Sequence, residues 1–130
     1  MDRYERHRKI WRFLYTLLNR PICRKFHMTH EDLHIEGPVL LIPNHVSAWD
    51  PLLVAMSLRD KQVYFVASEH IFRSPLAGKL IAWAQDPIPR QKGGSAASAV
   101  RAMLRHLKDG HNVAVFPEGN RSWDGVTNPF

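Results

Sequence analysis

The sequence predicts an α/β protein built on a mainly parallel sheet flanked by helices. Short apolar runs at residues 39–42, 63–67 and 113–116 have the composition of buried strands, because no polar face alternates within them. Apolar residues at helical spacing lie between these runs, most clearly over residues 95–108. Strands that alternate with helices favour parallel pairing, with helices covering both faces of the sheet.

The first 25 residues carry the net positive charge of the chain. They hold eight arginine or lysine residues against two acidic residues, a net +6, and the whole chain is also +6. The rest of the chain therefore balances at zero, so the basic character belongs to this segment alone. Anionic lipid and nucleic acid are the two partners that such a segment favours.

Apolar periodicity within residues 1–25 favours lipid. The segment reads as a basic amphipathic helix, with Arg8, Arg12, Thr16 and Asn19 on its polar side. The wide apolar face consists of Ile10, Trp11, Phe13, Leu14, Tyr15, Leu17 and Leu18. We expect residues 1–20 to bind an anionic membrane surface, peripherally and on the cytoplasmic side, with no nucleic-acid partner. The alternative is a helix that packs on its own domain and leaves its basic face in solvent.

This segment does not read as a membrane span or as a signal peptide. A span needs about 20 apolar residues, and the segment is too short and too charged. Arg12 interrupts the apolar stretch, and no small-residue cleavage site follows it.

Turn and capping signals predict the elements around the first two strands. A polar connector is expected after Pro21. Gly37-Pro38 marks the turn before the strand at 39–42. Asp50-Pro51 opens a short helix that runs to about Leu58.

Similar signals predict the second half of the chain. Ser74-Pro75 starts a helix, and Pro87 and Pro89 force a short extended piece that ends at Arg90. The helix over 95–108 stops at Gly110. The apolar face of the first of these helices is Leu76, Leu80, Ile81 and Ala84, and that of the second is Ala96, Val100, Met103, Leu104 and Leu107.

Polar residues follow two of the predicted strands. His45 follows the strand at 39–42, and Asp50 lies five residues further on, so the carboxylate can orient the imidazole as a base. Alternatively, His45 packs in a loop and Asp50 merely caps the helix that begins at Pro51. Glu118 follows the strand at 113–116 and could bind a ligand or fix the turn there. Ligands of parallel sheets gather at the carboxyl ends of the strands, so the two groups are expected to converge.

Two motifs, in this order, resemble those of the glycerolipid acyltransferase family, which includes 1-acylglycerol-3-phosphate acyltransferases. The first is Asn-His-x4-Asp at residues 44–50, and the second is Phe-Pro-Glu-Gly-Asn-Arg-Ser at residues 116–122. The resemblance implies a glycerolphosphate-acyltransferase-like fold. It also implies that His45 is the general base and that Asp50 is its partner.

The resemblance assigns the substrate-binding residues as well. Glu118, Gly119 and Arg121 match the family motif that binds the glycerol phosphate, although Asn120 stands where the family more often has threonine. Arg90 aligns with the arginine of a further acceptor-binding motif, G-x-x-F-x-x-R. The glycine and phenylalanine of that motif are replaced here, by Ala84 and Pro87.

The implied activity is transfer of a fatty acyl group from acyl-CoA or acyl carrier protein to a lysophospholipid hydroxyl. Lysophosphatidic acid (1-acylglycerol-3-phosphate) is such an acceptor, and the setting is phospholipid biosynthesis with no cofactor beyond the acyl donor. The resemblance covers residues 39–122, and the family has a further apolar strand beyond that point. We therefore expect the acyltransferase domain, residues 26–130, to be incomplete at its C-terminus. It would be truncated after the family's third motif, which is the one at residues 116–122.

Other classes of function have less support. The runner-up is an inactive lipid-binding or membrane-associated fragment of such an enzyme. A serine hydrolase is disfavoured because the sequence has no G-x-S-x-G elbow. A metal site at His45, Asp50 and Glu118 lacks the close-spaced His pair or Cys cluster that metal sites usually have, so no metal is expected. Cys23 is the single cysteine, which precludes an intrachain disulfide and suits a reducing compartment.

Overall fold

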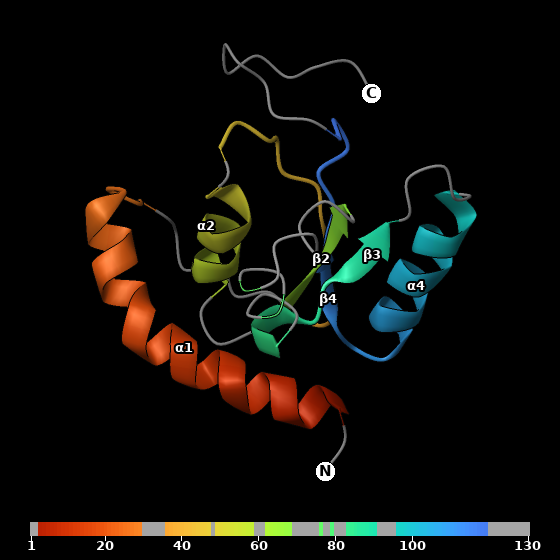
Figure 1. Cartoon of the computed structure of the whole chain (residues 1–130), viewed down its shortest axis with the longest axis horizontal. Helices are drawn as coiled ribbons and strands as arrows, with labels where there is room; N and C mark the ends of the chain where they lie inside the picture. The colour runs from red at the N-terminus through yellow and green to blue at the C-terminus, as the bar shows by residue number, and fades with distance from the viewer. Residues whose placement is uncertain are drawn as a thin grey trace.

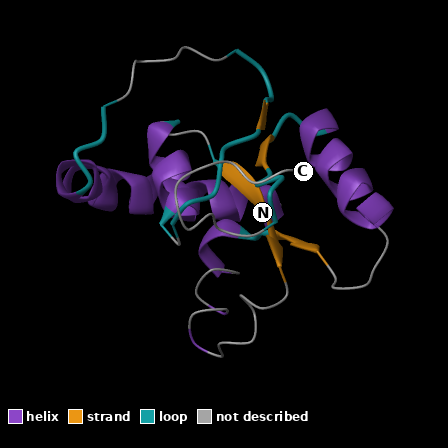
Figure 2. Ribbon diagram, turned by 90° about the horizontal axis from the view of Figure 1, so that it is seen from above, coloured by secondary structure: helices purple, strands orange, loops and turns teal. Residues whose placement is uncertain are grey.

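A computed structural model gives the fold of the chain. It describes residues 3–29, 36–47, 49–58, 62–68, 76, 79, 83–90 and 96–119. The helices are α1 (Arg3–Lys25), α2 (Asp50–Ser57) and α4 (Ala96–Lys108), and the strands are β1 (Leu40–Leu41), β2 (Val63–Ser68), β3 (Ile88–Arg90) and β4 (Asn112–Ala114). Trp83–Gln85 adds a helical turn before β3. The layers are visible in Figure 1 and, from above, in Figure 2, with α1 and α2 on one side of the sheet and α4 on the other.

The four strands form one sheet in the order β1-β4-β2-β3, and every neighbouring pair is parallel. The predicted parallel α/β fold is therefore confirmed. Leu40 of β1 and Tyr64 of β2 both stand opposite Val113 of β4. Because β1 and β4 are neighbours, the two segments that follow them leave the sheet at the same edge.

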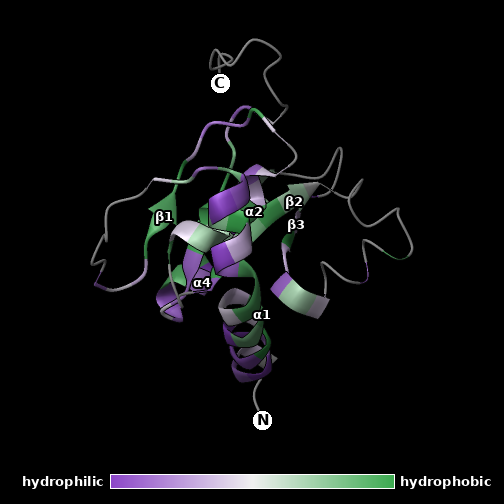
Figure 3. Cartoon of the chain, turned by 90° about the vertical axis from the view of Figure 1, so that its left-hand side faces the viewer, coloured by the Kyte–Doolittle hydropathy of each residue, from purple (hydrophilic) through white to green (hydrophobic). Residues whose placement is uncertain are grey.

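Side-chain alternation along the strands divides the apolar core into two layers. Val63 and Phe65 of β2 face α1 and α2, whereas Tyr64 between them faces α4. In Figure 3, β1 and most of β2 have the green colour of hydrophobic residues. The buried residues of the first layer are Trp11, Ala55, Met56, Leu58, Val63, Phe65 and Ala114, and those of the second are Tyr64, Ile88 and Val113.

The side chain of Asn112 links three strands at their starts. Its carbonyl oxygen accepts a hydrogen bond from the N–H of Val39 (3.2 Å), and its amide donates to the carbonyl of Gln62 (3.3 Å). Asn112 is 6% exposed, so these bonds satisfy a buried polar group that would otherwise be costly. They fix the strand that carries it between β1 and β2.

The wide apolar face predicted for α1 divides into two. Trp11 is 3% exposed and belongs to the core, whereas Phe13 and Leu17 are 67% and 61% exposed. The helix continues through Pro21 to Lys25, so the connector begins after Lys25 rather than directly after Pro21. The proline removes one backbone donor, but packing of Ile22 against the core outweighs this loss. Among the described residues, no helix is long and apolar enough to cross a membrane.

The first predicted strand is an edge strand rather than a fully buried one. Leu41 packs against the core, while Leu40 and Ile42 are 45% and 62% exposed. The reason is the sheet order, which places β1 at one edge. α4 packs mainly against the other three strands, β2, β3 and β4.

Two further predictions concern helices. Asp50–Ser57 confirms the short helix that begins at Asp50-Pro51, with proline in its first turn. The predicted apolar face of α4 is partly wrong, because Val100 and Leu104 are 44% and 52% exposed. Met103 and Leu107 of the predicted face do pack inward, together with Ala99 and Ala102, whose small side chains allow the helix to approach the sheet on that side.

The predicted end of α4 at Gly110 is confirmed. Gly110 has φ +83°, and its N–H donates to the carbonyl of Leu107, while the N–H of His111 donates to that of His106. This pair of bonds is a Schellman cap, in which glycine takes the left-handed conformation. The helix predicted from Ser74 lies mostly outside the described residues, in which Leu76 and Lys79 are helical.

The division of α1 can be tested by a matched pair of substitutions. Trp11→Ala should lower the free energy of unfolding by about 3–5 kcal/mol, because it leaves a cavity in the core. Phe13→Ala, on the exposed side of the same helix, should change it by less than about 0.5 kcal/mol. Chemical denaturation followed by circular dichroism measures both. Equal effects would contradict the packing of α1 through Trp11.

Candidate active site

The candidate site lies at the carboxyl ends of the parallel strands, where β1 and β4 end side by side. The N–H of Val115 donates to the carbonyl of Leu41 (3.0 Å), which continues the pairing of the two strands to this edge. β1 leads into residues 44–47, and β4 leads into residues 116–119. The two sequence motifs are therefore adjacent in space, as predicted.

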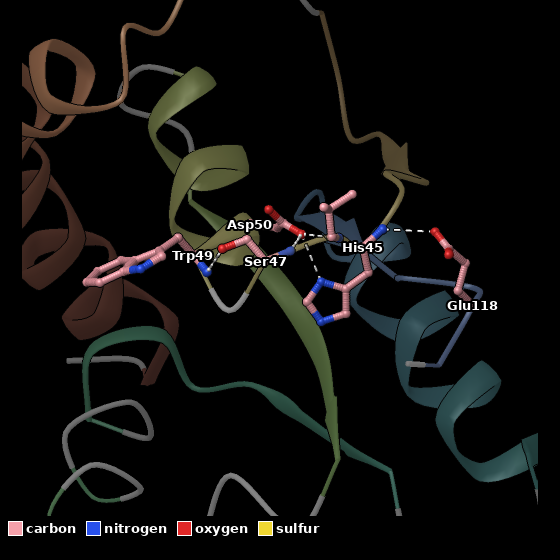
Figure 4. A network of polar contacts seen from close by, with 6 residues as sticks. His45, Ser47, Trp49, Asp50 and Glu118 are labelled. Atoms are coloured by element: carbon pink, nitrogen blue, oxygen red, sulfur yellow. Dashed lines mark hydrogen bonds and ion pairs between the residues drawn. The ribbon is translucent and has the colours of Figure 1, made fainter. Parts of the chain in front are cut away.

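His45 and Asp50 form a direct pair. Nδ1 of His45 lies 2.9 Å from Oδ2 of Asp50, and the two side chains are 20% and 17% exposed. Asp50 is the first residue of α2, so the start of that helix fixes the carboxylate beside the ring. Among the residues that the structure describes, none hydrogen-bonds Nε2 of His45. That nitrogen is on the far side of the ring from Asp50 (Figure 4).

Asp50 also holds the backbone of the loop before α2. The same oxygen, Oδ2, accepts hydrogen bonds from the N–H groups of Val46 and Ser47, each at 2.7 Å. These partners precede α2, and its N-cap residue, Trp49, has no side-chain hydrogen bond. The carboxylate therefore binds His45 and the loop, and does not merely cap the helix. Ser47 stabilises the turn into the helix, because its Oγ accepts a hydrogen bond from the N–H of Trp49 (3.2 Å).

These contacts keep Asp50 ionised. Partial burial by itself raises the pKa of this carboxyl, but the hydrogen bonds outweigh it, the largest from the N–H of Ser47, and the pKa lies below its ordinary value. The unfolded chain therefore binds a proton more readily than the folded protein at this group. The stabilisation from Asp50 is present at neutral pH and is lost only as the pH falls below about 4.

Phe116 packs against the face of the His45 imidazole. It was not predicted from the sequence as a site residue. Its ring stacks on that of His45, with centroids 4.4 Å apart and planes at 28°. Phe116 in turn stacks on the buried ring of Phe65, at 6.2 Å and 12°. The only sequence signal for this role was the position of Phe116, directly after an apolar strand and before Glu118.

Glu118 reaches from the end of β4 to the loop that carries His45. Its Oε1 accepts a hydrogen bond from the backbone N–H of His45 at 2.9 Å (Figure 4). Gly119 follows with φ +68° and donates its N–H to the carbonyl of Phe116 (3.2 Å), which closes a tight turn. A side chain at position 119 would be strained in this conformation.

Arg90 comes to the same place from β3. Its Nη1 lies 4.0 Å from where a Cβ on Gly119 would stand. The structure therefore brings five of the predicted site residues into one region. His45 follows β1, Glu118 and Gly119 follow β4, Asp50 begins α2, and Arg90 ends β3. Arg121 lies outside the described residues.

In the part of the chain that the structure describes, no group of three His, Cys, Asp or Glu side chains is arranged to hold a metal. The three residues considered as metal ligands in the sequence have hydrogen-bond partners within the protein. His45 and Asp50 bond to each other, and an oxygen of Glu118 accepts from a backbone N–H.

A histidine oriented by a carboxylate, at the carboxyl edge of a parallel sheet and near a guanidinium, defines a candidate site for general-base chemistry on an anionic substrate. Comparison with known proteins makes this more specific. The sequence profile of the Acyltransferase family matches residues 24–130. The chain therefore belongs to the acyltransferase family.

Several characterised relatives are similar over most of this chain. The lyso-ornithine lipid O-acyltransferase of Rhizobium meliloti (strain 1021) is 37% identical over 95 residues, which are 72% of this chain and 31% of the relative. A 1-acyl-sn-glycerol-3-phosphate acyltransferase of Borreliella burgdorferi is 28% identical over 101 residues, 77% of this chain and 40% of the relative. A chloroplastic 1-acyl-sn-glycerol-3-phosphate acyltransferase, LPAT1 of Arabidopsis thaliana, is 29% identical over an alignment 142 positions long. This alignment covers 89% of this chain and 38% of the relative. The chain thus spans less than half the length of these relatives.

The geometry of the pair predicts the tautomer of His45. In the neutral imidazole, the proton should reside on Nδ1 and be donated to Asp50, which leaves Nε2 as an acceptor. Long-range ¹⁵N–¹H correlation spectra of the ring measure this directly. Asp50→Ala should increase the Nε2–H form, whereas Asp109→Ala, a remote surface control, should not. A ring of the wild-type protein that is mainly Nε2–H would contradict the assignment.

Proposed function

We propose that this chain carries the catalytic centre of an acyltransferase in phospholipid biosynthesis. The enzyme would move a fatty acyl group from an acyl thioester, acyl-CoA or acyl carrier protein, to the hydroxyl of a lysophospholipid such as 1-acylglycerol-3-phosphate. The observation that carries this proposal is the 2.9 Å contact between His45 Nδ1 and Asp50 Oδ2, at the edge where the second motif also lies. It supports His45 as a base whose Nε2 is available for a substrate.

The proposed reaction is a direct transfer. Nε2 of His45 takes the proton of the acceptor hydroxyl while the hydroxyl oxygen attacks the thioester carbonyl carbon. The carbon–sulfur bond breaks, the thiolate leaves, and the imidazolium returns the proton to it. The products are a new ester and a free thiol, and the reaction uses no cofactor. Asp50 stabilises the imidazolium that forms in between.

Two alternative nucleophiles, Ser47 and Cys23, have other contacts. Oγ of Ser47 accepts a hydrogen bond from the N–H of Trp49, within the turn into α2. Sγ of Cys23 lies on α1 and donates to Oδ1 of Asn19 at 2.8 Å. These contacts support direct attack by the acceptor rather than an acyl-enzyme.

The function is tested by assaying a full-length protein with labelled acyl-CoA or acyl carrier protein and 1-acylglycerol-3-phosphate. A parallel reaction with lyso-ornithine lipid tests the other acceptor named among the relatives. His45→Ala should lower the rate by roughly 10²–10⁴-fold, because it removes the base. Asp50→Asn should also reduce it heavily, while Ser47→Ala and Cys23→Ala should stay active. Absence of turnover with every donor and acceptor, together with retained vesicle binding, would favour the lipid-binding alternative.

Arg90 and Arg121 are the proposed ligands of the acceptor phosphate, since a guanidinium offers a bidentate fork to phosphate oxygens. The position of the Arg90 guanidinium beside Gly119 supports this assignment for Arg90. Gly119 would keep the approach to the phosphate open.

Arg90→Ala and Arg121→Lys should raise the KM for the phosphate acceptor and leave the KM for the acyl donor unchanged. A point charge cannot replace a planar fork, so lysine is not a conservative change here. Arg101→Ala, at an exposed position on α4, serves as the charge-matched control. Steady-state kinetics with each substrate varied in turn give both constants. Unaltered acceptor kinetics would assign these arginines to structure.

The outer side of α1 is the proposed contact with an anionic membrane surface, which would make the protein peripheral on the cytoplasmic side. Residues spaced three or four apart form a row opposite the core-facing side of the helix, and all of them are exposed. Apolar Phe13 and Leu17 occupy its centre, and cations occupy both ends. The row is Arg6, Lys9, Phe13, Leu17, Arg20 and Arg24. An apolar strip flanked by basic residues is typical of interfacial helices.

The double substitution Phe13→Ser with Leu17→Ser should weaken binding to vesicles that contain anionic lipid. The matched control is Val100→Ser with Leu104→Ser, an exposed apolar pair at the same spacing on α4. Deleting residues 1–20 should also remove binding, but that deletion removes Trp11 from the core, so the double substitution is the sharper test. Co-sedimentation at increasing salt is the measurement, and binding should weaken because each basic residue near such a surface contributes about 1 kcal/mol. Equal binding by both double variants would contradict the assignment.

A further inference from the structure

Three consecutive backbone N–H groups in the loop between β1 and α2 donate hydrogen bonds to two carboxylates. The N–H of His45 donates to Glu118, and those of Val46 and Ser47 donate to Asp50. Glu118 comes from the opposite side of the loop, from a segment 73 residues away in the sequence. The backbone around the proposed base is therefore held from both sides.

The turn after β4 directs Glu118 toward this N–H. Positive φ at Gly119 and its bond to the carbonyl of Phe116 fold the segment back immediately after the strand. As a result, the exit of β4 touches His45 twice, through the stacked ring of Phe116 and through the carboxylate of Glu118. Asp50 sets the rotation of the ring, whereas Glu118 sets the position of the backbone that carries it.

We propose that Glu118 is a positioning residue for His45 rather than a ligand of the acceptor. This inference rests on the proposed function of His45 as a base. A hydrogen bond from a backbone N–H to a carboxylate is charge-assisted and therefore stronger than one between neutral groups. It also occupies a carboxylate oxygen that would otherwise be available to a substrate hydroxyl. A carboxylate also repels a phosphate group, which the neighbouring guanidinium of Arg90 attracts.

The two roles predict different kinetics. A positioning residue acts on the chemical step, because a displacement of the base by about 1 Å can cost roughly 10²-fold in rate. Glu118→Ala should therefore lower kcat by about 100-fold and leave the KM values of donor and acceptor unchanged. Glu118→Gln keeps an oxygen that can accept the N–H of His45, so it should recover most of the lost kcat although it lacks the charge. A ligand of the acceptor would instead show a raised acceptor KM in both variants.

A measurement without substrates separates this inference from the proposed function. Hydrogen exchange of the His45 amide, followed by ¹⁵N–¹H spectra, should be faster in Glu118→Ala than in the wild type, and its proton resonance should move upfield. Glu118→Gln should retain slow exchange, and so should Glu5→Ala, which removes a carboxylate from the surface of α1. If the wild-type protein is inactive on every substrate, this measurement still tests the bond. An unchanged His45 amide in Glu118→Ala, or a raised acceptor KM with unchanged kcat, would overturn the proposal.

Discussion

The parallel pairing of β1 with β4 is the constraint on which the rest of the site depends. Leu40 opposite Val113 and Leu41 opposite Ala114 set the register, and Val113 and Ala114 are fully buried. A slip of one residue would turn each side chain of a strand to the other face of the sheet. It would also move His45 away from Phe116 and Glu118. The packing of the core therefore determines the position of the proposed base.

Polar contacts at both ends of the strands reinforce this pairing. Asn112 links β1 and β2 at their starts, and Glu118 links the loop after β1 to the turn after β4. Segments joined in this way are far apart in sequence, so the contacts form only once the sheet is assembled. Asp50 differs, because its partners lie within five residues and its contacts are local. The ring of His45 is thus oriented locally, while its place in the molecule is set by tertiary structure.

The sequence was informative where local chemistry decides the structure. Asp50-Pro51 opened a helix and Gly110 closed one, because proline and glycine have strong conformational preferences. The sequence was less informative where neighbours decide. Helical periodicity placed Val100 and Leu104 on the side of the helix expected to face the core. It did not show that the sheet would contact the side with Ala99 and Ala102 instead. The contacts of Phe116 and Glu118 with His45 depend on sheet order and turn geometry, which no local pattern reveals.

The central claim is that the acceptor attacks the thioester directly, with His45 as the base. The most direct test incubates a full-length protein with labelled acyl thioester in the absence of acceptor and measures its intact mass. Direct attack predicts an unmodified protein that transfers the label to 1-acylglycerol-3-phosphate once this acceptor is added. A stoichiometric acyl adduct on Ser47 or Cys23 that is then passed to the acceptor would contradict it.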